Sequence, residues 1–221
     1  MIAVVFALEF ESAGFRAVQS RQLCVETWNL GVTGVRSADA LRRMIAINQP
    51  EIIVSAGFSG SLSPELQMGA IVIGQNYTDP DLLRLLSVFP QYRTGPIVTA
   101  PYILETAAAK NELAAASGAL AGDLESEHLH KVCLETGIKM VSVRTISDTL
   151  QQDLPVPGDI LINPESGKTD PSAIFRYLFT HPAKAAQFAR LVTGAKVAQQ
   201  SLARALAEIL PALLKRGNDG D

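Results

Sequence analysis

Carboxylates follow three of the apolar segments in this sequence. Glu11 comes shortly after the first of them, Glu125 follows a short stretch of small residues, and Asp148 follows the last one. Ligands of doubly wound sheets bind outside the carboxyl ends of the strands, so we expect these acids to meet at one edge of a sheet. Converging carboxyl groups suit cleavage of a bond to an anomeric carbon, because one can protonate the leaving group while another activates water or steadies positive charge.

The elements that must position these acids alternate between strands and helices. Runs that are apolar throughout are typical of strands covered on both faces of a sheet. Strands are predicted at 2–7, 51–56, 70–73, 96–99 and 139–146, and helices at 37–48, 105–116, 124–135 and 183–210. This alternation predicts an α/β fold in which a doubly wound, mostly parallel sheet lies between two layers of helices.

The chain to residue 215 is expected to form one domain. Between 150 and 182 the pattern fades into a segment rich in proline and glycine, which predicts a loop or lid with a short helix near 172–179. The segment 183–215 is predicted to be a C-terminal helix whose apolar stripe packs in the core or against a second copy, and which Pro211 breaks or kinks. Residues 216–221 are expected to form a flexible tail.

Composition argues against several classes of function. A net charge of −3 offers no basic field for a nucleic acid, so no nucleic-acid partner is expected. Cys24 and Cys133 are too few for a disulfide framework or a cysteine zinc site and are interpreted as buried thiols. No apolar run reaches the ~18 residues of a membrane-spanning helix, and the first residues lack the basic start of a signal peptide. The sequence therefore predicts a reduced protein of the cytoplasm.

Three motifs of other kinds of site are incomplete. The turn expected at 57–61 is similar to a nucleophile elbow, but G-x-S-x-G requires glycine at the position of Ser61. The glycines of 31–34 do not form the dinucleotide-binding pattern. His128 and His130 would point in different directions from one helix, so we expect no metal ion bound between them.

Each acid also has an ordinary structural interpretation. Glu125 falls in the first turn of a predicted helix, where an acid interacts favourably with the helix dipole, and Asp148 could cap the segment after it. Glu9 and Glu11 could be solvated acids of a loop. The sequence also contains the residue types of a nucleophilic catalytic triad, which Ser59, Asp148 and a histidine could form. The residues alone leave these alternatives open.

Six segments of the sequence, taken in their order and spacing, form one pattern. They are 5–11, 31–38, 50–62, 66–73, 123–126 and 143–148. The most specific pair is the Asp-Leu-Glu-Ser of 123–126 and the predicted strand that ends in Ser-Asp at 148. Together the segments resemble the nucleoside phosphorylase superfamily, most closely its 5′-methylthioadenosine/S-adenosylhomocysteine nucleosidase branch. The resemblance covers about residues 2–150 and implies the three-layer fold of that superfamily, with a mixed sheet.

The resemblance implies a role for each acid. Asp148 would be the general acid that donates a proton toward N7 of a departing purine, and Ser147 would orient it. Glu125 would accept hydrogen bonds from the ribose hydroxyls, and Leu124 would pack under the sugar. Glu11 would activate the attacking water. The substrate implied is a small purine nucleoside of the 5′-methylthioadenosine type, cleaved by hydrolysis with release of adenine.

Further site residues follow from the same resemblance. Tyr102 and Ile103 stand where the family frames the base. Phe58, Ser59 and Gly60 stand in the loop that contacts the sugar and its water or phosphate. No metal or organic cofactor is implied. The family commonly assembles as dimers or larger, so a homodimer or a higher homo-oligomer is expected.

Departures from the family pattern open two alternatives. The places of the phosphate-binding arginines fall near Ser12 and Ser55, which favours hydrolysis, although Arg16 and Arg36 could substitute. Residues 169–172 and the basic helix after them are similar to hopanoid-associated phosphorylases of the same superfamily, which implies phosphorolysis of an adenosyl compound as one alternative. Phe58 replaces a serine and could block the sugar site, so a non-catalytic nucleoside-binding protein is the other.

Overall fold

The structure is a computed structural model that describes residues 1–18, 25–32, 34–163 and 169–216. Among these residues eight strands form one sheet, with the order β2-β1-β3-β8-β4-β5 and with β7 and β6 continuing from β3. The strands are β1 Ile2–Phe6, β2 Val25–Asn29, β3 Ile52–Ser61, β4 Ile71–Gly74, β5 Arg93–Gly95, β6 Ile97–Thr99, β7 Ala121–Asp123 and β8 Lys139–Asp148. Cys24, predicted to be a buried thiol, and the predicted tail after residue 216 lie outside the described residues.

Most neighbouring strands are parallel. β1 runs parallel to β2 and β3, β3 to β8, β4 to β5, and β6 to β7. Only β4 against β8 and β7 against the end of β3 are antiparallel among the described pairs. β1, β3 and β8 therefore present their carboxyl ends at one edge of the sheet, where ligands of such sheets bind.

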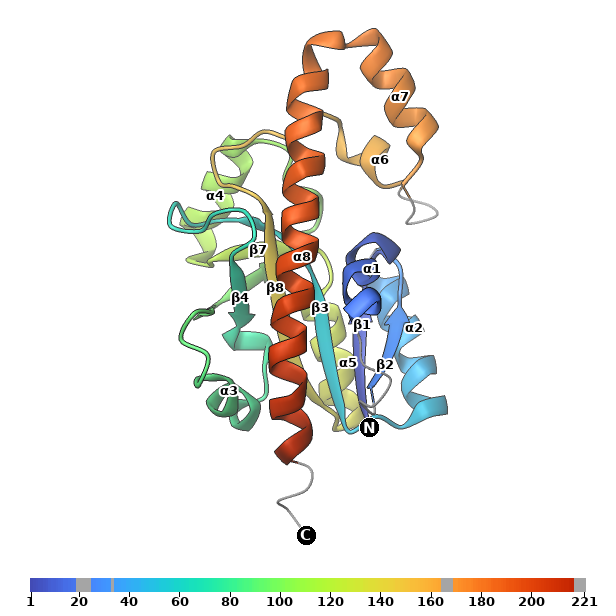
Figure 1. Ribbon diagram of the computed structural model, residues 1–221, viewed down its shortest axis with the longest axis vertical. Helices are drawn as coiled ribbons and strands as arrows, with labels where there is room; N and C mark the ends of the chain where they lie inside the picture. The colour runs from blue at the N-terminus through green and yellow to red at the C-terminus, as the bar shows by residue number, and fades with distance from the viewer. Residues whose placement is uncertain (19–24, 33, 164–168, 217–221) are drawn as a thin grey trace.

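Helices cover both faces of this sheet, as Figure 1 shows. α1 (Glu9–Val18), α3 (Pro80–Leu86) and the long α8 (Ala185–Arg216) pack on one face, and α2 (Gly34–Asn48) and α5 (Ser126–Thr136) pack on the other. In β1, Val4 contacts the first group and Val5 the second, because successive side chains of a strand point to opposite faces. The predicted three-layer α/β fold is confirmed. Burial of both faces of β1 explains why its sequence is apolar throughout.

The remaining helices lie around the carboxyl edge of the sheet. α4 (Ala107–Ser117) precedes β7, while α6 (Gly158–Leu161) and α7 (Pro171–Thr180) connect β8 to α8. Short 3₁₀ turns occur at Gln75–Tyr77 and Pro182–Lys184. Figure 1 shows α6 and α7 beside the N-terminal part of α8, beyond the end of the sheet. None of the described helices is long and apolar enough to span a membrane.

Two predicted boundaries are wrong in ways that matter for the site. The segment 57–61 is not a turn but the second half of β3, which pairs with β8 on one side and with β7 on the other. Small residues fit there because backbone and acidic side chains approach closely. Glu9 and Glu11 do not lie in a loop but in the first turn of α1. That turn fixes Glu11 against the sheet, where a loop would leave it solvated.

Two edge strands and one proline also differ from the predictions. β2 and β5 were not expected, because their sequences mix polar and apolar residues, as is common at sheet edges. Pro211 does not end the C-terminal helix, which continues to Arg216. A proline inside a helix costs about 3 kcal/mol, but Leu210 and Leu213 beside it are fully buried in the core and offset that cost.

Candidate functional site

A cavity of about 490 Å³ opens at the carboxyl ends of β1, β3 and β8. Its polar lining includes Glu11, Glu125 and Asp148, which the structure brings together from α1, the start of α5 and the end of β8. The opposite wall is mostly apolar and comes from residues on or beside α6, α7 and α8. The meeting of the three acids, expected from their positions after strands, is therefore observed.

Glu11 is held rigidly by backbone groups. Its Oε2 accepts hydrogen bonds from the N–H of Ala7 (3.1 Å) and Leu8 (2.9 Å), and its Oε1 accepts one from the N–H of Phe58 (2.8 Å). A Cβ on Gly57 would lie 3.1 Å from Oε1, so a glycine there lets the strand approach the carboxyl group. Burial raises the pKa of Glu11 above its ordinary value, and the three hydrogen bonds partly oppose that rise. Such a fixed, weakly acidic carboxyl group is suited to accept a proton from water.

Glu125 stands at the N-cap of α5 but its side chain does not cap the helix. It lines the cavity instead. Burial, followed by the negative charges of Asp123 and Glu11, raises the pKa of Glu125 to about 8, while Arg144 works in the opposite direction. At neutral pH its carboxyl group is thus largely protonated, and it can both donate to and accept from vicinal hydroxyl groups.

Glu125→Gln is expected to stabilise the protein at high pH. The carboxyl titrates at 4.5 in its ordinary state and at about 8 in the folded chain, so folding binds a proton between these values. This stabilisation is complete below pH 4.5 and is lost as the pH rises through 8. The neutral amide avoids the loss. At pH 9 thermal unfolding should show Tm higher by about 5–10 °C.

The control for this prediction is the exposed Glu127→Gln, two residues along the same helix, which should not change Tm at either pH. At pH 5 the Glu125 variant and the wild type should melt together. Equal Tm values at pH 9 would contradict the raised pKa.

Asp148 ends β8 and has partners on both carboxylate oxygens. Ser147 Oγ donates to Oδ1 (2.8 Å), and the ammonium group of Lys110 on α4 donates to Oδ2. Gly60 of β3 lies opposite, where a Cβ would stand 3.2 Å from Oδ2. The side chain of Asp148 is mostly buried but still lines the cavity. It can therefore reach a bound molecule while protein groups fix its orientation.

Arg144 lies beneath Glu125 as the centre of a closed network. Its Nε donates to Asp123 (2.6 Å), Nη1 to the carbonyl oxygens of Ser55 and Val143, and Nη2 to the hydroxyls of Ser55 and Ser126. These bonds use all five guanidinium donors. The buried arginine thus supports the floor of the site and has no donor left for an anion.

The other predicted residues surround the same cavity. Leu124, Ile103 and Tyr102 line it, and so do three consecutive residues of β3, Phe58, Ser59 and Gly60. Tyr102 is 66% exposed, which places it at the mouth. The Phe58 ring meets that of Phe10 edge to face at 6.1 Å between centroids, and the cavity remains open beside it. Ser59 Oγ is buried and, within the described residues, has no hydrogen-bond partner, so it can serve a polar atom of a ligand.

Sequence reasoning missed two features of the site. No site predicted from the sequence includes Lys110, which is fully buried and is the only basic residue of the predicted segment 105–116. The apolar stripe of α8 was assigned to the core or a dimer face, whereas Phe188, Val192 and Ala195 line the cavity. Position along the chain could not reveal this, because α8 returns to the site only through the path of α6 and α7.

His128 and His130, the two histidines considered as metal ligands, have packing contacts in the described part of the chain. His128 packs closely on Gly34, where a Cβ would clash with its ring at 2.0 Å. The His130 ring packs against Tyr77 at 5.5 Å between centroids. Within the described ranges, no group of three or more histidine, cysteine or acidic residues could hold a metal ion. Both histidines are therefore packing residues between α5 and its neighbours.

Comparison with known proteins identifies relatives of this fold. A family model described as "Phosphorylase superfamily" matches residues 76–193, just over half of the chain. Similar structures include 5′-methylthioadenosine/S-adenosylhomocysteine nucleosidases from Helicobacter pylori and Neisseria meningitidis, 13% and 15% identical, each with a TM-score of 0.70 over 95% of this chain and 97% of theirs. Futalosine hydrolase of H. pylori is 14% identical, with a TM-score of 0.66 over 97% of both chains. No curated protein matches the sequence.

Proposed function

Because the chain belongs to the phosphorylase superfamily, we propose that it cleaves the N-glycosidic bond of a purine nucleoside by hydrolysis, releasing adenine. The observation that carries this proposal is the meeting of Glu11, Glu125 and Asp148 around one cavity. Carboxyl groups in different environments can divide the roles of acid, base and sugar ligand between them.

The proposed mechanism assigns each carboxyl group by its surroundings. Asp148, oriented by Ser147, donates a proton to N7 of the purine as the bond from C1′ to N9 breaks. Glu125 holds the ribose hydroxyls and Leu124 lies beside the sugar. Glu11 accepts a proton from the water that attacks C1′. Tyr102 and Ile103 frame the base at the mouth of the cavity.

The basic residues of the site favour hydrolysis over phosphorolysis. Of the described residues that line the cavity and the small pocket beside it, only Lys110 and Arg144 are basic. All donors of Arg144 are used within the protein, and Lys110 is engaged by Asp148 and two carbonyl oxygens. Arg16 and Arg36 are exposed and line neither pocket. A phosphate ion would thus lack the charged donors it needs.

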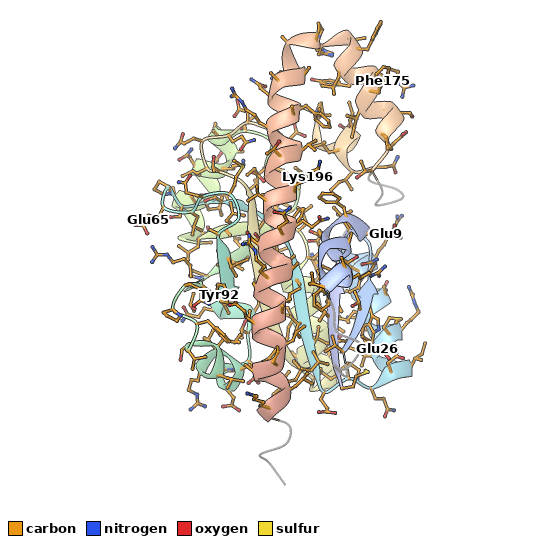
Figure 2. The ribbon with its side chains drawn as sticks, in the orientation of Figure 1. Glu9, Glu26, Glu65, Tyr92, Phe175 and Lys196 are labelled. Atoms are coloured by element: carbon orange, nitrogen blue, oxygen red, sulfur yellow. The ribbon has the colours of Figure 1, made fainter. Side chains whose placement is uncertain are left out.

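One observation favours the substrate of the second candidate, an adenosyl compound with a bulky apolar 5′ group, although it does not bear on phosphorolysis. Beyond the acids the cavity is lined by Leu161, Ile174, Phe188 and Leu191. Such a wall suits an apolar substituent larger than a methylthio group. Phe175, labelled on α7 in Figure 2, is 72% exposed and is not among the residues that line the cavity. The nature of the 5′ group and that of the nucleophile are separate questions, and one assay addresses both.

Purine release measured with and without phosphate tests the proposal. Adenosine, 5′-methylthioadenosine and an adenosyl compound with a long alkyl 5′ group are the substrates. Release of adenine in phosphate-free buffer supports hydrolysis. Strict dependence on phosphate supports the phosphorylase. Saturable nucleoside binding with no release from any substrate would leave the non-catalytic binding protein, against which the open cavity beside Phe58 already argues.

Ala195→Phe tests the apolar wall. This residue of α8 lines the cavity, and a ring there would fill space that a bulky 5′ group needs. We expect kcat/KM for the long-alkyl substrate to fall about 10–100-fold, with a smaller change for adenosine. Ala189→Phe, exposed on the same helix and outside the cavity, is the matched control. An equal loss for both substrates would contradict the location of the 5′ group.

The organisation of the whole molecule is part of the proposal. We propose one domain over residues 1–215, in which described residues of 150–163 and 169–182 line the cavity and α8 completes its wall. Assembly as a homodimer or a higher homo-oligomer and a location in the cytoplasm remain predictions. Sedimentation of the purified protein would test the dimer.

A further inference from the structure

Lys110 is a buried residue whose ammonium group is hydrogen-bonded to Asp148, the general acid of the proposed mechanism. Its side chain is 0% exposed. The ammonium group donates one hydrogen bond to Asp148 Oδ2, one to the carbonyl oxygen of Thr149 (3.1 Å) and one to that of Gln152 (2.8 Å). Its three protons are therefore all directed at partners on the segment that ends β8 and follows it.

A buried ammonium group is costly to maintain without such partners. A residue of an alanine-rich helix could instead be apolar at this position, as most residues of α4 are. The other acids on the neighbouring segments have different partners: Glu105 accepts from the N–H of Gly158, and Asp153 accepts from that of Ala107. Asp148 is thus the acidic group to which Lys110 is directed.

The ion pair raises a question of proton supply. The contact of Lys110 Nζ with Asp148 Oδ2 has the geometry of an ammonium group paired with a carboxylate. Ser147 also donates to Asp148, on the other oxygen. Loss of a proton from Ser147 would leave an alkoxide, whereas the ammonium group of Lys110 becomes neutral when it gives one up. Of these two donors, Lys110 is therefore the one suited to pass a proton to Asp148.

We propose that Lys110 is a positioning residue that acts through Asp148 and supplies the proton taken by the departing purine, an inference that rests on the proposed function. As the bond from C1′ to N9 breaks, its electron pair goes to the purine. The proton of Lys110 Nζ passes to Asp148 Oδ2, and Asp148 delivers that proton to N7. Water adds its hydroxyl group to C1′ and its proton goes to Glu11. Transfer of that proton to solvent and reprotonation of Lys110 from solvent complete the cycle.

Lys110→Met tests this with two substrates that differ in their need for an acid. Adenosine needs protonation of its base, whereas 4-nitrophenyl riboside releases a stable anion. We expect kcat for adenosine to fall about 100-fold with KM changed less than about threefold, and kcat for the nitrophenyl riboside to be nearly unchanged. Lys131→Met, exposed on α5, should leave both rates unchanged.

An equal loss on both substrates would overturn the role of Lys110 while the proposed function stands on the activity of the wild type. Failure of the wild type to cleave either substrate would overturn both proposals. If Lys110→Met does not fold, because an unpaired carboxylate is left buried, the double variant with Asp148→Asn removes both charges. Its rate should equal that of Asp148→Asn alone, and a further loss would contradict action through Asp148.

Discussion

Asp148→Asn is expected to lower the rate of purine release by a factor of about 10³ while nucleoside binding remains measurable. The amide keeps the size of the carboxyl group, its one oxygen can accept from Lys110, and its NH₂ group can donate to the hydroxyl oxygen of Ser147. It cannot hold and deliver a proton. The loss should therefore appear in kcat, measured as adenine released, and the dissociation constant from titration should change little.

The matched control is Asp159→Asn, which lies on α6 with an exposed side chain. It should retain the wild-type rate. An unchanged rate in Asp148→Asn would remove this residue from the mechanism. Loss of binding together with folding would instead identify Asp148 as a partner that Lys110 needs for stability.

The central strands could be predicted because burial dictates their composition. β1 and the first halves of β3 and β8 are covered on both faces, so their sequences are continuous apolar runs. The second half of β3 contains glycine and serine and reads as a turn. It extends as a strand because β8 and β7 supply hydrogen-bond partners on both sides, which is tertiary information.

The three acids could be predicted because each follows a strand that ends at the same edge. Their surroundings could not. Arg144 sits in the middle of an apolar run, and nothing in its neighbours along the chain indicates that Asp123 and Ser55 face it. Lys110 reaches Asp148 across 38 residues. The apolar wall depends on the path of 150–163 and 169–182, whose sequence contains few regular patterns.

Phe58 illustrates how a local departure misleads. The sequence suggests that a large ring replaces a serine inside the sugar site. In the structure the backbone N–H of Phe58 binds Glu11, and its ring packs on Phe10 and against the apolar core cluster. The backbone of this position supplies the polar contact, and the side chain contributes to the apolar rim. A residue type alone therefore does not decide whether a site is blocked.

Glu11→Gln is expected to reduce kcat about 10²–10⁴-fold, because an amide cannot accept a proton from water. Three backbone N–H groups converge on the carboxylate, and the amide NH₂ must turn a donor toward at least one of them, which also costs stability.

Since burial raises the pKa of Glu11 and a base acts when ionised, kcat/KM of the wild type should fall as the pH drops through that raised value. This fall, the acidic limb of the pH profile of kcat/KM, should disappear in Glu11→Gln. Glu9→Gln, exposed in the same turn of α1, is the control and should keep both the rate and the limb. Persistence of the limb in Glu11→Gln would assign it to another group and leave the water without this base.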